Sequence, residues 1–295
     1  MAEQDPSAPA LFDLSTLTPT APSPPSFMDL EDPRYAYMYG FLQADGHMSS
    51  QSRQKGRLTV EINARDIQIL REFQQLTPYN SSITERTRAT NFSKSHHSAI
   101  WTLSSLEARN TLDRLGLPYG KKSKKITPPR VPFSRRDYLR GVIDADGSVG
   151  FTGQGFPFVS LTTSSTAVGA YLCHYAKKVT GAERRIKRNT RDGIYNVMYT
   201  KEAAVQLVTH LYYPDCLALE RKKTAAASLT SWERPPGMKV RPPRKPWTAE
   251  ADRILLVAPT LAHAAAELGR SQSSCQVRRW RLTNGIATSA VPDVR

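Results

Sequence analysis

Two short stretches of this chain are near copies of each other, and they constrain its fold more than any other feature. Residues 38–46 read MYGFLQADG, and residues 139–147 read LRGVIDADG. Each copy is an apolar run with glycine at its third position and Ala-Asp-Gly at its end. The last acids of the copies, Asp45 and Asp146, are 101 positions apart. This spacing predicts two similar half-domains of about a hundred residues each.

Small residues in each copy predict that two helices pack closely. Gly40 and Ala44 are four positions apart, as are Gly141 and Ala145. On a helix each pair lies on one face, where small side chains let a second backbone approach. The glycine that ends each copy predicts a left-handed cap that terminates the helix.

The two acids are then expected side by side at two helix C-termini. A helix C-terminus carries partial negative charge, so two adjacent carboxylates are unfavourable there. A divalent cation between them would remove this cost, because hard cations take oxygen ligands. Asp45 and Asp146 are therefore predicted to be metal ligands, for Mg²⁺ or Mn²⁺. The alternative is an ordinary buried helix pair with a capping Asp, which the matched repeat disfavours.

Both stretches resemble the LAGLIDADG motif of homing endonucleases and related intron maturases. The second copy matches at almost every position, whereas the first has Gln43 in place of the earlier Asp and keeps the later acid, Asp45. The resemblance extends over about residues 31–230 and is to single-chain members with a doubled motif. It implies an α+β fold in which two pseudo-symmetric αββαββα-like half-domains form a DNA saddle. It also implies phosphodiester hydrolysis by metal held on Asp45 and Asp146.

The resemblance further implies polar helpers for the acids. Residues 119–140, YGKKSKKITPPRVPFSRRDYLR, resemble a family block in which a lysine assists catalysis, and Lys125 or Lys122 is the candidate. Asn63 fits a polar position after the first motif, although the lysine that follows it in many members is missing. Lys201 is one residue to which the role of a missing lysine could shift.

The charge of the chain favours a polyanionic partner. Its formal net charge is +15, and its isoelectric point is near 9.9. Basic side chains alternate along two strand-like stretches, and Arg and Asn are the residues that read guanine and adenine. The alternative is a pair of solvated edge strands. The predicted DNA contacts in the two halves are Arg86, Arg88, Arg185, Lys187, Asn189, Arg191, Lys121 and Lys122.

Each half is expected to run helix–strand–helix–strand–strand–helix. In the second half, residues 184–191 and 194–199 are predicted strands joined by a hairpin turn at Asp192-Gly193. The shared order supports a duplication. The remaining expected elements are strands at 57–62, 82–90, 99–103 and 158–162 and helices at 66–76, 105–115, 166–179 and 202–211.

The C-terminal part has a different character. Residues 232–246 form a basic, Pro-rich linker that should be stiff. Three helices are expected after it, the first capped by Thr248, the second ended by Gly269 and the third capped by Ser271. Residues 247–285 resemble a Myb/SANT-like helix-turn-helix, in which the third helix enters the major groove. This implies DNA contacts from Arg278, Arg279 and Arg281; the alternative is a small packing appendage.

The remaining organisation follows from composition. Residues 1–30 are rich in Pro, Ser and Thr and predict a disordered tail, and a second tail is expected at 286–295. The half-domains are placed at 31–130 and 131–231. No targeting signal is visible, no apolar run approaches a membrane span, and three scattered cysteines fit a reducing compartment. A free-standing, cytoplasmic, nucleoid-associated protein of a prokaryotic or phage-infected cell is expected.

These features predict a site-specific homing endonuclease that cuts both strands of a long asymmetric DNA target as a monomer. Two alternatives stay open. One is a catalytically degenerate LAGLIDADG DNA-binding transcription regulator, which Gln43 and the missing strand lysines favour and the retained acids disfavour. The other is an intron maturase that binds intron RNA, which needs the basic surface but not the acids.

Overall fold

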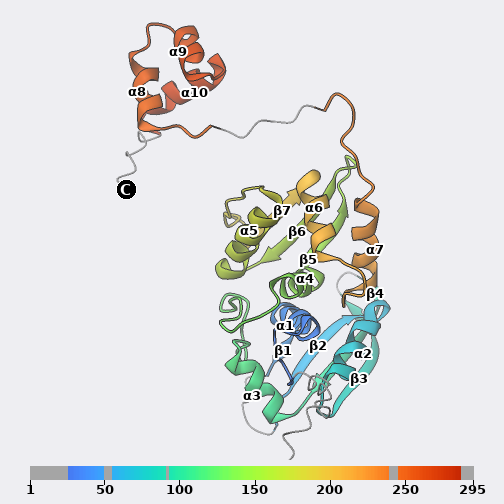
Figure 1. Ribbon diagram of the computed structural model, residues 1–295. Helices are drawn as coiled ribbons and strands as arrows, with labels where there is room; N and C mark the ends of the chain where they lie inside the picture. The colour runs from blue at the N-terminus through green and yellow to red at the C-terminus, as the bar shows by residue number, and fades with distance from the viewer. Residues whose placement is uncertain (1–25, 50–54, 91–92, 239–244, 287–295) are drawn as a thin grey trace, which may run out of the picture. The chain divides into compact units, whose positions relative to one another are not determined.

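The computed structural model describes residues 26–49, 55–90, 93–238 and 245–286. The chain divides into two compact units, residues 1–234 and 235–295 (Figure 1). Most of the predicted tails and the centre of the predicted linker lie outside the described residues. The described end of the N-terminal tail belongs to the core, because Met28 and Leu30 are buried.

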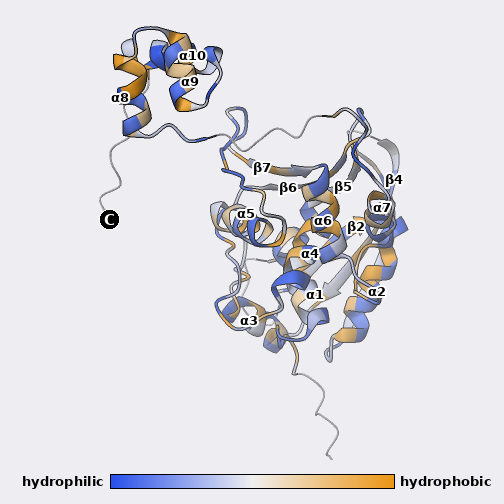
Figure 2. Cartoon of the chain, turned by 45° about the horizontal axis from the view of Figure 1, so that its top comes forward, coloured by the Kyte–Doolittle hydropathy of each residue, from blue (hydrophilic) through white to orange (hydrophobic). Residues whose placement is uncertain are grey.

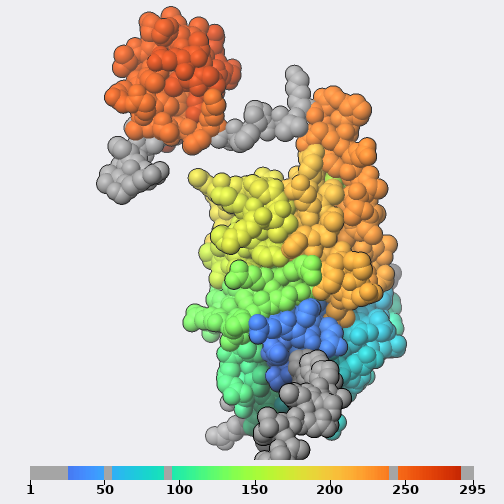
Figure 3. Space-filling view, viewed as in Figure 1, coloured from blue at the N-terminus to red at the C-terminus, as the bar shows by residue number. Residues whose placement is uncertain are grey.

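Two helices, α1 (Pro33–Asp45) and α4 (Arg135–Asp146), pack against each other at the centre of the first unit. Figure 3 shows their residues as adjoining layers between the two halves of the chain. Every residue from Tyr35 to Gln43 of α1 is buried, so α1 is a core helix rather than a surface helix.

The glycines of the repeated stretches make this close packing possible. A Cβ on Gly40 would overlap the carbonyl oxygen of Tyr138, and a Cβ on Gly141 would overlap that of Tyr37. The two contacts are related by the internal repeat. The packing predicted from the small residues is therefore confirmed, and any larger side chain at either glycine would push the helices apart.

The first half places a four-stranded antiparallel sheet beside α1. Its strand order is β1-β2-β4-β3. Phe73 of the second helix packs edge-to-face on Trp101, so that helix covers the core face of the sheet. In Figure 2, hydrophobic and hydrophilic residues alternate along this helix, as its half-buried position requires. The elements are β1 (His47–Met48), β2 (Leu58–Asn63), the 3-10 turn η2 (Ala64–Asp66), α2 (Ile67–Leu76), β3 (Ser81–Thr90), β4 (Ser93–Leu103) and α3 (Leu106–Arg114).

The second half repeats this plan with a smaller antiparallel sheet of order β5-β6-β7. One continuous hydrophobic core joins both halves through α1 and α4. The predicted α+β class with two antiparallel sheets is confirmed. The elements are β5 (Gly147–Phe151), β6 (Pro157–Thr163), α5 (Thr166–Thr180), β7 (Tyr195–Thr200), α6 (Glu202–Leu211) and α7 (Glu220–Leu229).

The predicted strand at residues 184–191 is wrong. This segment has only an isolated bridge between Arg188 and Tyr195, followed by a turn in which Gly193 has a positive φ of 69°. Ile186 is its one side chain packed against the core. A run of charged residues with one apolar anchor does not supply the alternating face that fixes a strand on a sheet.

The predicted left-handed caps at Gly46 and Gly147 are also wrong. Both residues are extended, with φ of −66° and −105°. The chain turns there directly into a strand. Glycine is needed for space, because a Cβ would lie 2.6 Å from the Leu42 carbonyl oxygen at Gly46 and 2.5 Å from the Ser160 carbonyl oxygen at Gly147.

The last helix of the first unit, α7, was not predicted. Its apolar residues are small, so its sequence gives a weak periodic signal, yet it packs against β5. No helix among the described residues is long and apolar enough to span a membrane.

The described part of the second unit contains three short helices, α8 (Ala249–Val257), α9 (Leu261–Leu268) and α10 (Gln272–Thr283). Its core is small and is centred on Leu255 and Cys275. The predicted helix ends are confirmed: Thr248 and Ser271 accept capping hydrogen bonds, and Gly269 is left-handed.

Candidate active site

Asp45 and Asp146 are the last residues of α1 and α4, and both are reached by solvent although protein atoms surround much of each carboxylate. The helix contact brings them near each other. Burial raises the pKa of Asp146 to about 6, and the charge of Asp45 adds to this increase. The pKa of Asp45 is likewise raised, chiefly by burial. The carboxylates are thus accessible to a ligand while the surrounding protein disfavours their joint ionisation.

Lys122 lies between the two acids. Its ammonium group donates to the carbonyl oxygens of Gln43, at 2.5 Å, and Ala44, at the C-terminus of α1. Burial lowers the pKa of Lys122, and the charges of Asp146 and Asp45 oppose that decrease. A cation at this position stabilises the negative end of the helix and both carboxylates.

Two depressions meet at Lys122. One, of about 840 Å³, is lined by Asp45 and Lys122 together with Lys121, Lys124 and Lys125. The other, of about 210 Å³, is lined by Asp146 and Lys122 with Thr162 and Thr163. Each acid therefore opens onto its own basic or polar recess, and Lys122 borders both.

Lys222 repeats this arrangement in the second half. It is 4% exposed, and its ammonium group donates to the carbonyl oxygens of Ile143, Asp144 and Gly147 at 2.6–2.7 Å. Burial lowers its pKa to about 8. The repeat offset contained this signal: Lys122 follows Asp45 by 77 positions, and Lys222 follows Asp146 by 76. Sequence reasoning missed the position of Lys222 at the helix end.

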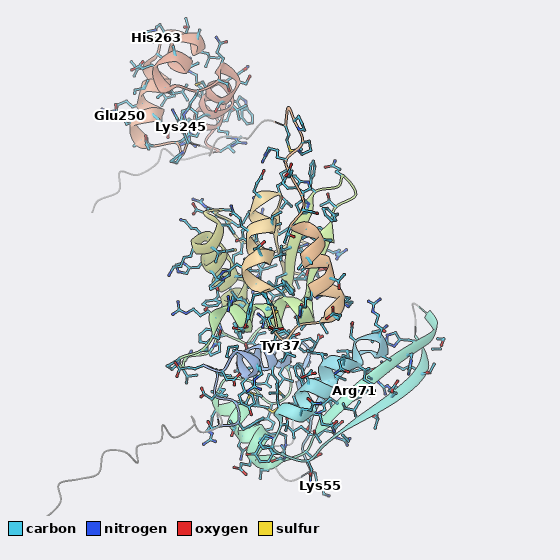
Figure 4. All side chains as sticks on the ribbon, turned by 45° about the vertical axis from the view of Figure 1, so that its right-hand side comes forward. Tyr37, Lys55, Arg71, Lys245, Glu250 and His263 are labelled. Carbon is cyan, nitrogen blue, oxygen red and sulfur yellow. The ribbon has the colours of Figure 1, made fainter. Side chains whose placement is uncertain are left out.

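Asp144, the earlier acid of the second motif, points into the protein. Its carboxylate accepts hydrogen bonds from the hydroxyls of Tyr37 (2.8 Å) and Tyr212 (2.6 Å) and from the Leu219 backbone N–H (2.8 Å). Burial raises its pKa despite these bonds. Tyr37 lies where α1 meets the second half (Figure 4), so Asp144 fastens the two halves and the segment before α7.

Gln43 likewise forms internal hydrogen bonds in the first half. Its amide donates to the Tyr39 hydroxyl and the Thr127 carbonyl, both at 3.0 Å, and accepts from the Tyr138 hydroxyl at 2.8 Å. It is fully buried. The replacement of an acid by Gln43 therefore changes an internal tether and leaves the exposed acid pair intact.

The donor set fits a divalent cation. Among the described residues, no three His, Cys, Asp or Glu side chains form a metal-binding group. Mg²⁺ is commonly held by one or two carboxylates, with substrate phosphates and water completing the shell. Asp45 and Asp146 supply two hard oxygen donors whose mutual repulsion a cation would relieve.

The structure places the other predicted catalytic residues outside this pair. Lys125 is exposed on the rim of the larger depression, next to Lys122. Asn63 accepts a hydrogen bond from the Arg65 backbone N–H and so caps the turn η2. Lys201 follows β7, and its ammonium lies 4.8 Å from the centre of the Phe156 ring. The Lys201 backbone N–H donates to the Pro157 carbonyl oxygen, at the end of β6 that is remote from Asp146. The fold therefore does not bring Lys201 to the two acids.

The predicted DNA contacts in the first half lie at two places. Arg86 and Arg88 lie on β3 and are both ion-paired to Glu61 of β2. Lys121 lines the larger depression with Lys122. Sequence reasoning missed Glu61, since only the sheet register brings it within reach of the arginines.

The predicted contacts in the second half lie in a loop rather than on a strand face. Arg185, Lys187, Asn189 and Arg191 are exposed. The Asn189 side chain accepts hydrogen bonds from two backbone N–H groups of the following turn, and Arg191 pairs with the neighbouring Asp192. The alternation argument for these four residues therefore fails, although the charges of the three basic ones are solvent-accessible.

The three arginines of α10 differ in their surroundings. Arg278 forms a two-point ion pair with the buried Asp252, with contacts of 2.7 and 2.5 Å, so it holds α10 to α8. Arg279 donates to the Leu256 carbonyl oxygen at 3.3 Å, near the end of α8. Arg281 is exposed. Of the three, Arg281 is the best placed to reach another molecule.

No protein-family model and no curated protein matches this chain. Among solved structures, it is similar to the homing endonuclease I-WcaI bound to its DNA recognition sequence, at 17% identity over 67% of this chain and 87% of that chain, with a TM-score of 0.48. It is similar to I-SmaMI bound to uncleaved DNA target in the presence of calcium ions, at 13% identity over 59% and 81%, with a TM-score of 0.39. It is also similar to full-length DUF199/WhiA from Thermatoga maritima, at 11% identity over 85% and 90%, with a TM-score of 0.42.

Proposed function

We propose that this protein is a site-specific DNA endonuclease that hydrolyses phosphodiester bonds in both strands with the help of Mg²⁺ or Mn²⁺. The strongest support is the pairing of Asp45 and Asp146 at the ends of two tightly packed helices, with Lys122 between them. A purely structural helix pair has no need for exposed carboxylates at both negative helix ends.

In this proposal Asp45 and Asp146 hold the divalent cation. The bound metal would supply Lewis-acid activation of water and stabilise charge on the scissile phosphate. Lys122 gives two of its three N–H donors to the end of α1. Its remaining donor is available to a phosphate oxygen in either depression. Lys121, Lys124 and Lys125 attract the DNA backbone to the same place.

The proposed target is long and asymmetric, and one chain binds it. The two half-domains, 31–130 and 131–231, differ in sheet size and in their exposed basic residues, so the two DNA half-sites would differ as well. The three-helix unit would act as an accessory helix-turn-helix domain. Arg281 is its proposed base or phosphate contact.

A cleavage assay tests this proposal. Duplex DNA from the locus of the protein's own gene, and a random-sequence duplex library, would be incubated with the protein and Mg²⁺ or Mn²⁺. We expect cuts in both strands at one site for the wild type, and none for Asp45→Asn or Asp146→Asn, which should still bind that site. Cleavage by either variant at the wild-type rate would exclude the assigned acids.

A second candidate is a DNA-binding regulator without nuclease activity. Lys222 supports it, because all three of its ammonium donors are used inside the protein and it has none left for substrate. Specific binding without cleavage at any metal concentration would favour this function. Preferential binding of the host intron RNA over duplex DNA would instead favour a maturase.

A further inference from the structure

The open face of the first sheet carries an acidic residue among its basic ones. Helix α2 covers the face that bears Trp101, and the opposite face bears Glu61, Arg86 and Arg88. A carboxylate on a surface that meets DNA repels the phosphate backbone. Its presence on this face, next to two arginines, therefore needs a physical reason.

Three strands contribute to a network around Glu61. The Arg86 guanidinium donates to Glu61 Oε2 at 2.6 Å, and the Arg88 guanidinium donates to Oε1 at 3.1 Å. From the strand between them, the Ser98 hydroxyl donates to Oε1 at 2.8 Å, and Ser98 is fully buried. Ser98 fixes the carboxylate from below, and the carboxylate fixes both arginines.

The bonds favour the charged form of Glu61. Burial acts to raise its pKa, but the hydrogen bonds from Ser98 and Arg86 outweigh burial, and the pKa lies below its ordinary value. The network is therefore ionised at neutral pH. It joins one negative and two positive charges, so it keeps one net positive charge for a polyanion.

Both arginines keep donors for a second partner. Each uses one Nη2 proton for Glu61 and leaves Nε, Nη1 and the second Nη2 proton without a hydrogen bond to any residue that the structure describes, so one edge of each guanidinium keeps two parallel donors. The side chains of Arg86 and Arg88 are 44% and 50% exposed. An arginine with a fixed plane and free donors is suited to the two-point recognition of guanine O6 and N7.

We propose that Glu61 is a specificity-determining residue: it positions Arg86 and Arg88 for base recognition and restrains them from neutralising phosphates on non-target DNA. This inference rests on the proposed DNA-binding function. Glu61 acts through the arginines and is a positioning residue. Without it, two mobile arginines would bind any duplex more tightly and discriminate less between sequences.

The chain provides a matched control. Glu85 lies on the same hairpin but on the opposite face, where it pairs with His97 at 2.9 Å. Glu85→Gln and Glu61→Gln remove the same charge from the same hairpin. A second test variant, Ser98→Ala, releases the Glu61 carboxylate without changing the net charge.

The experiment measures dissociation constants by fluorescence anisotropy over a series of salt concentrations, without divalent metal. The probes are a duplex selected by the wild-type protein from a random library and a scrambled duplex of the same length. Thermal melting of each variant reports folding.

For Glu61→Gln we expect the ratio of specific to non-specific affinity to fall by roughly ten- to a hundred-fold, the range of one good bidentate contact. Non-specific affinity should rise, and the slope of log K against log salt should steepen by about 0.9 for each additional phosphate neutralised. Ser98→Ala should lower the ratio in the same direction, and Glu85→Gln should leave it unchanged.

Two results would overturn the inference while DNA binding stands: equal ratios for wild type and Glu61→Gln, or equal losses for Glu61→Gln and Glu85→Gln. If Glu61→Gln does not fold, an unchanged ratio in Ser98→Ala overturns it. A wild-type protein with no preference for any selected duplex would instead refute the proposed function itself.

Discussion

Lys122 and Lys222 occupy equivalent positions at the ends of α1 and α4, but Lys222 is bound by three carbonyl oxygens and Lys122 by two. An ammonium group has three donors. Lys222 is therefore saturated within the protein, and Lys122 retains one donor beside the two acids. Two residues that a sequence repeat makes equivalent are thus expected to differ in function.

Lys122→Met should leave a folded protein with impaired chemistry, whereas Lys222→Met should mainly cost stability. The second change removes the ammonium donor from three carbonyl oxygens, and each polar group left without a partner costs about 1–3 kcal/mol. Chemical denaturation and a single-turnover cleavage assay would separate the two effects. A Lys122→Met variant that is less stable than Lys222→Met and cleaves normally would contradict this assignment.

Without metal, the contribution of Asp146 to stability should fall as pH rises from about 4 to about 6. The pKa of Asp146 is about 6 in the folded protein against an ordinary value of 3.8, chiefly because of burial and then because of Asp45. The folded state holds this proton more tightly, so protonation stabilises the fold, and the gain is lost as pH rises through the folded pKa.

Melting temperatures in EDTA would check this prediction. The stability advantage of Asp146→Asn over the wild type should be larger at pH 7 than at pH 4.5, and added Mg²⁺ should reduce it at pH 7. An advantage that is equal at both pH values would show that Asp146 does not strain the metal-free fold.

Gly141→Ala should destabilise the first unit by about 3 kcal/mol or more, at or above the upper end of typical overpacking costs. The added Cβ would overlap the Tyr37 carbonyl oxygen, and backbone atoms cannot move aside as a flexible side chain can. Cleavage activity should also be lost, because the contact between α1 and α4 positions Asp45 and Asp146.

Gly153→Ala is the control for this change, since a Cβ there meets no atom within 4 Å. Its free energy of unfolding should stay within about 0.5 kcal/mol of the wild-type value. Denaturant titration of both variants measures the difference. Equal stabilities would mean that the two helices do not pack as closely as described.

Arg278→Ala and Arg281→Ala should separate folding from binding in the second unit. Removing Arg278 breaks the two-point ion pair with the fully buried Asp252 carboxylate, and breaking a buried pair typically costs about 3–5 kcal/mol. The small core of this unit should then unfold. Arg281→Ala should keep its helical circular dichroism and weaken DNA binding, with the salt slope reduced by about 0.9. Loss of helicity in Arg281→Ala would give Arg281 a structural role instead.

The sequence alone determined the plan of the first unit. Two copies of an apolar stretch with Gly at position three and Ala-Asp-Gly at the end predicted two close-packed helices. The small residues that allow this contact lie within each stretch, so the pattern can be recognised locally. Alternating apolar residues at 58–62 and the capping residues Ser165, Thr248 and Ser271 likewise encode elements through neighbours in the chain. Such signals can be recognised because both partners lie within a few residues of each other.

Tertiary structure decided what each polar residue of the site does. Gln43 and Asp144 occupy the same earlier position of the two motif copies, and both are internal tethers, because the helix faces they occupy turn toward Tyr138 and Tyr212. Lys222 and Glu61 gain their roles from partners 79 and 25–37 residues away. The prediction of a strand at 184–191 was wrong for the same reason. A strand requires a neighbouring surface that buries its alternate side chains, and other parts of the chain provide that surface.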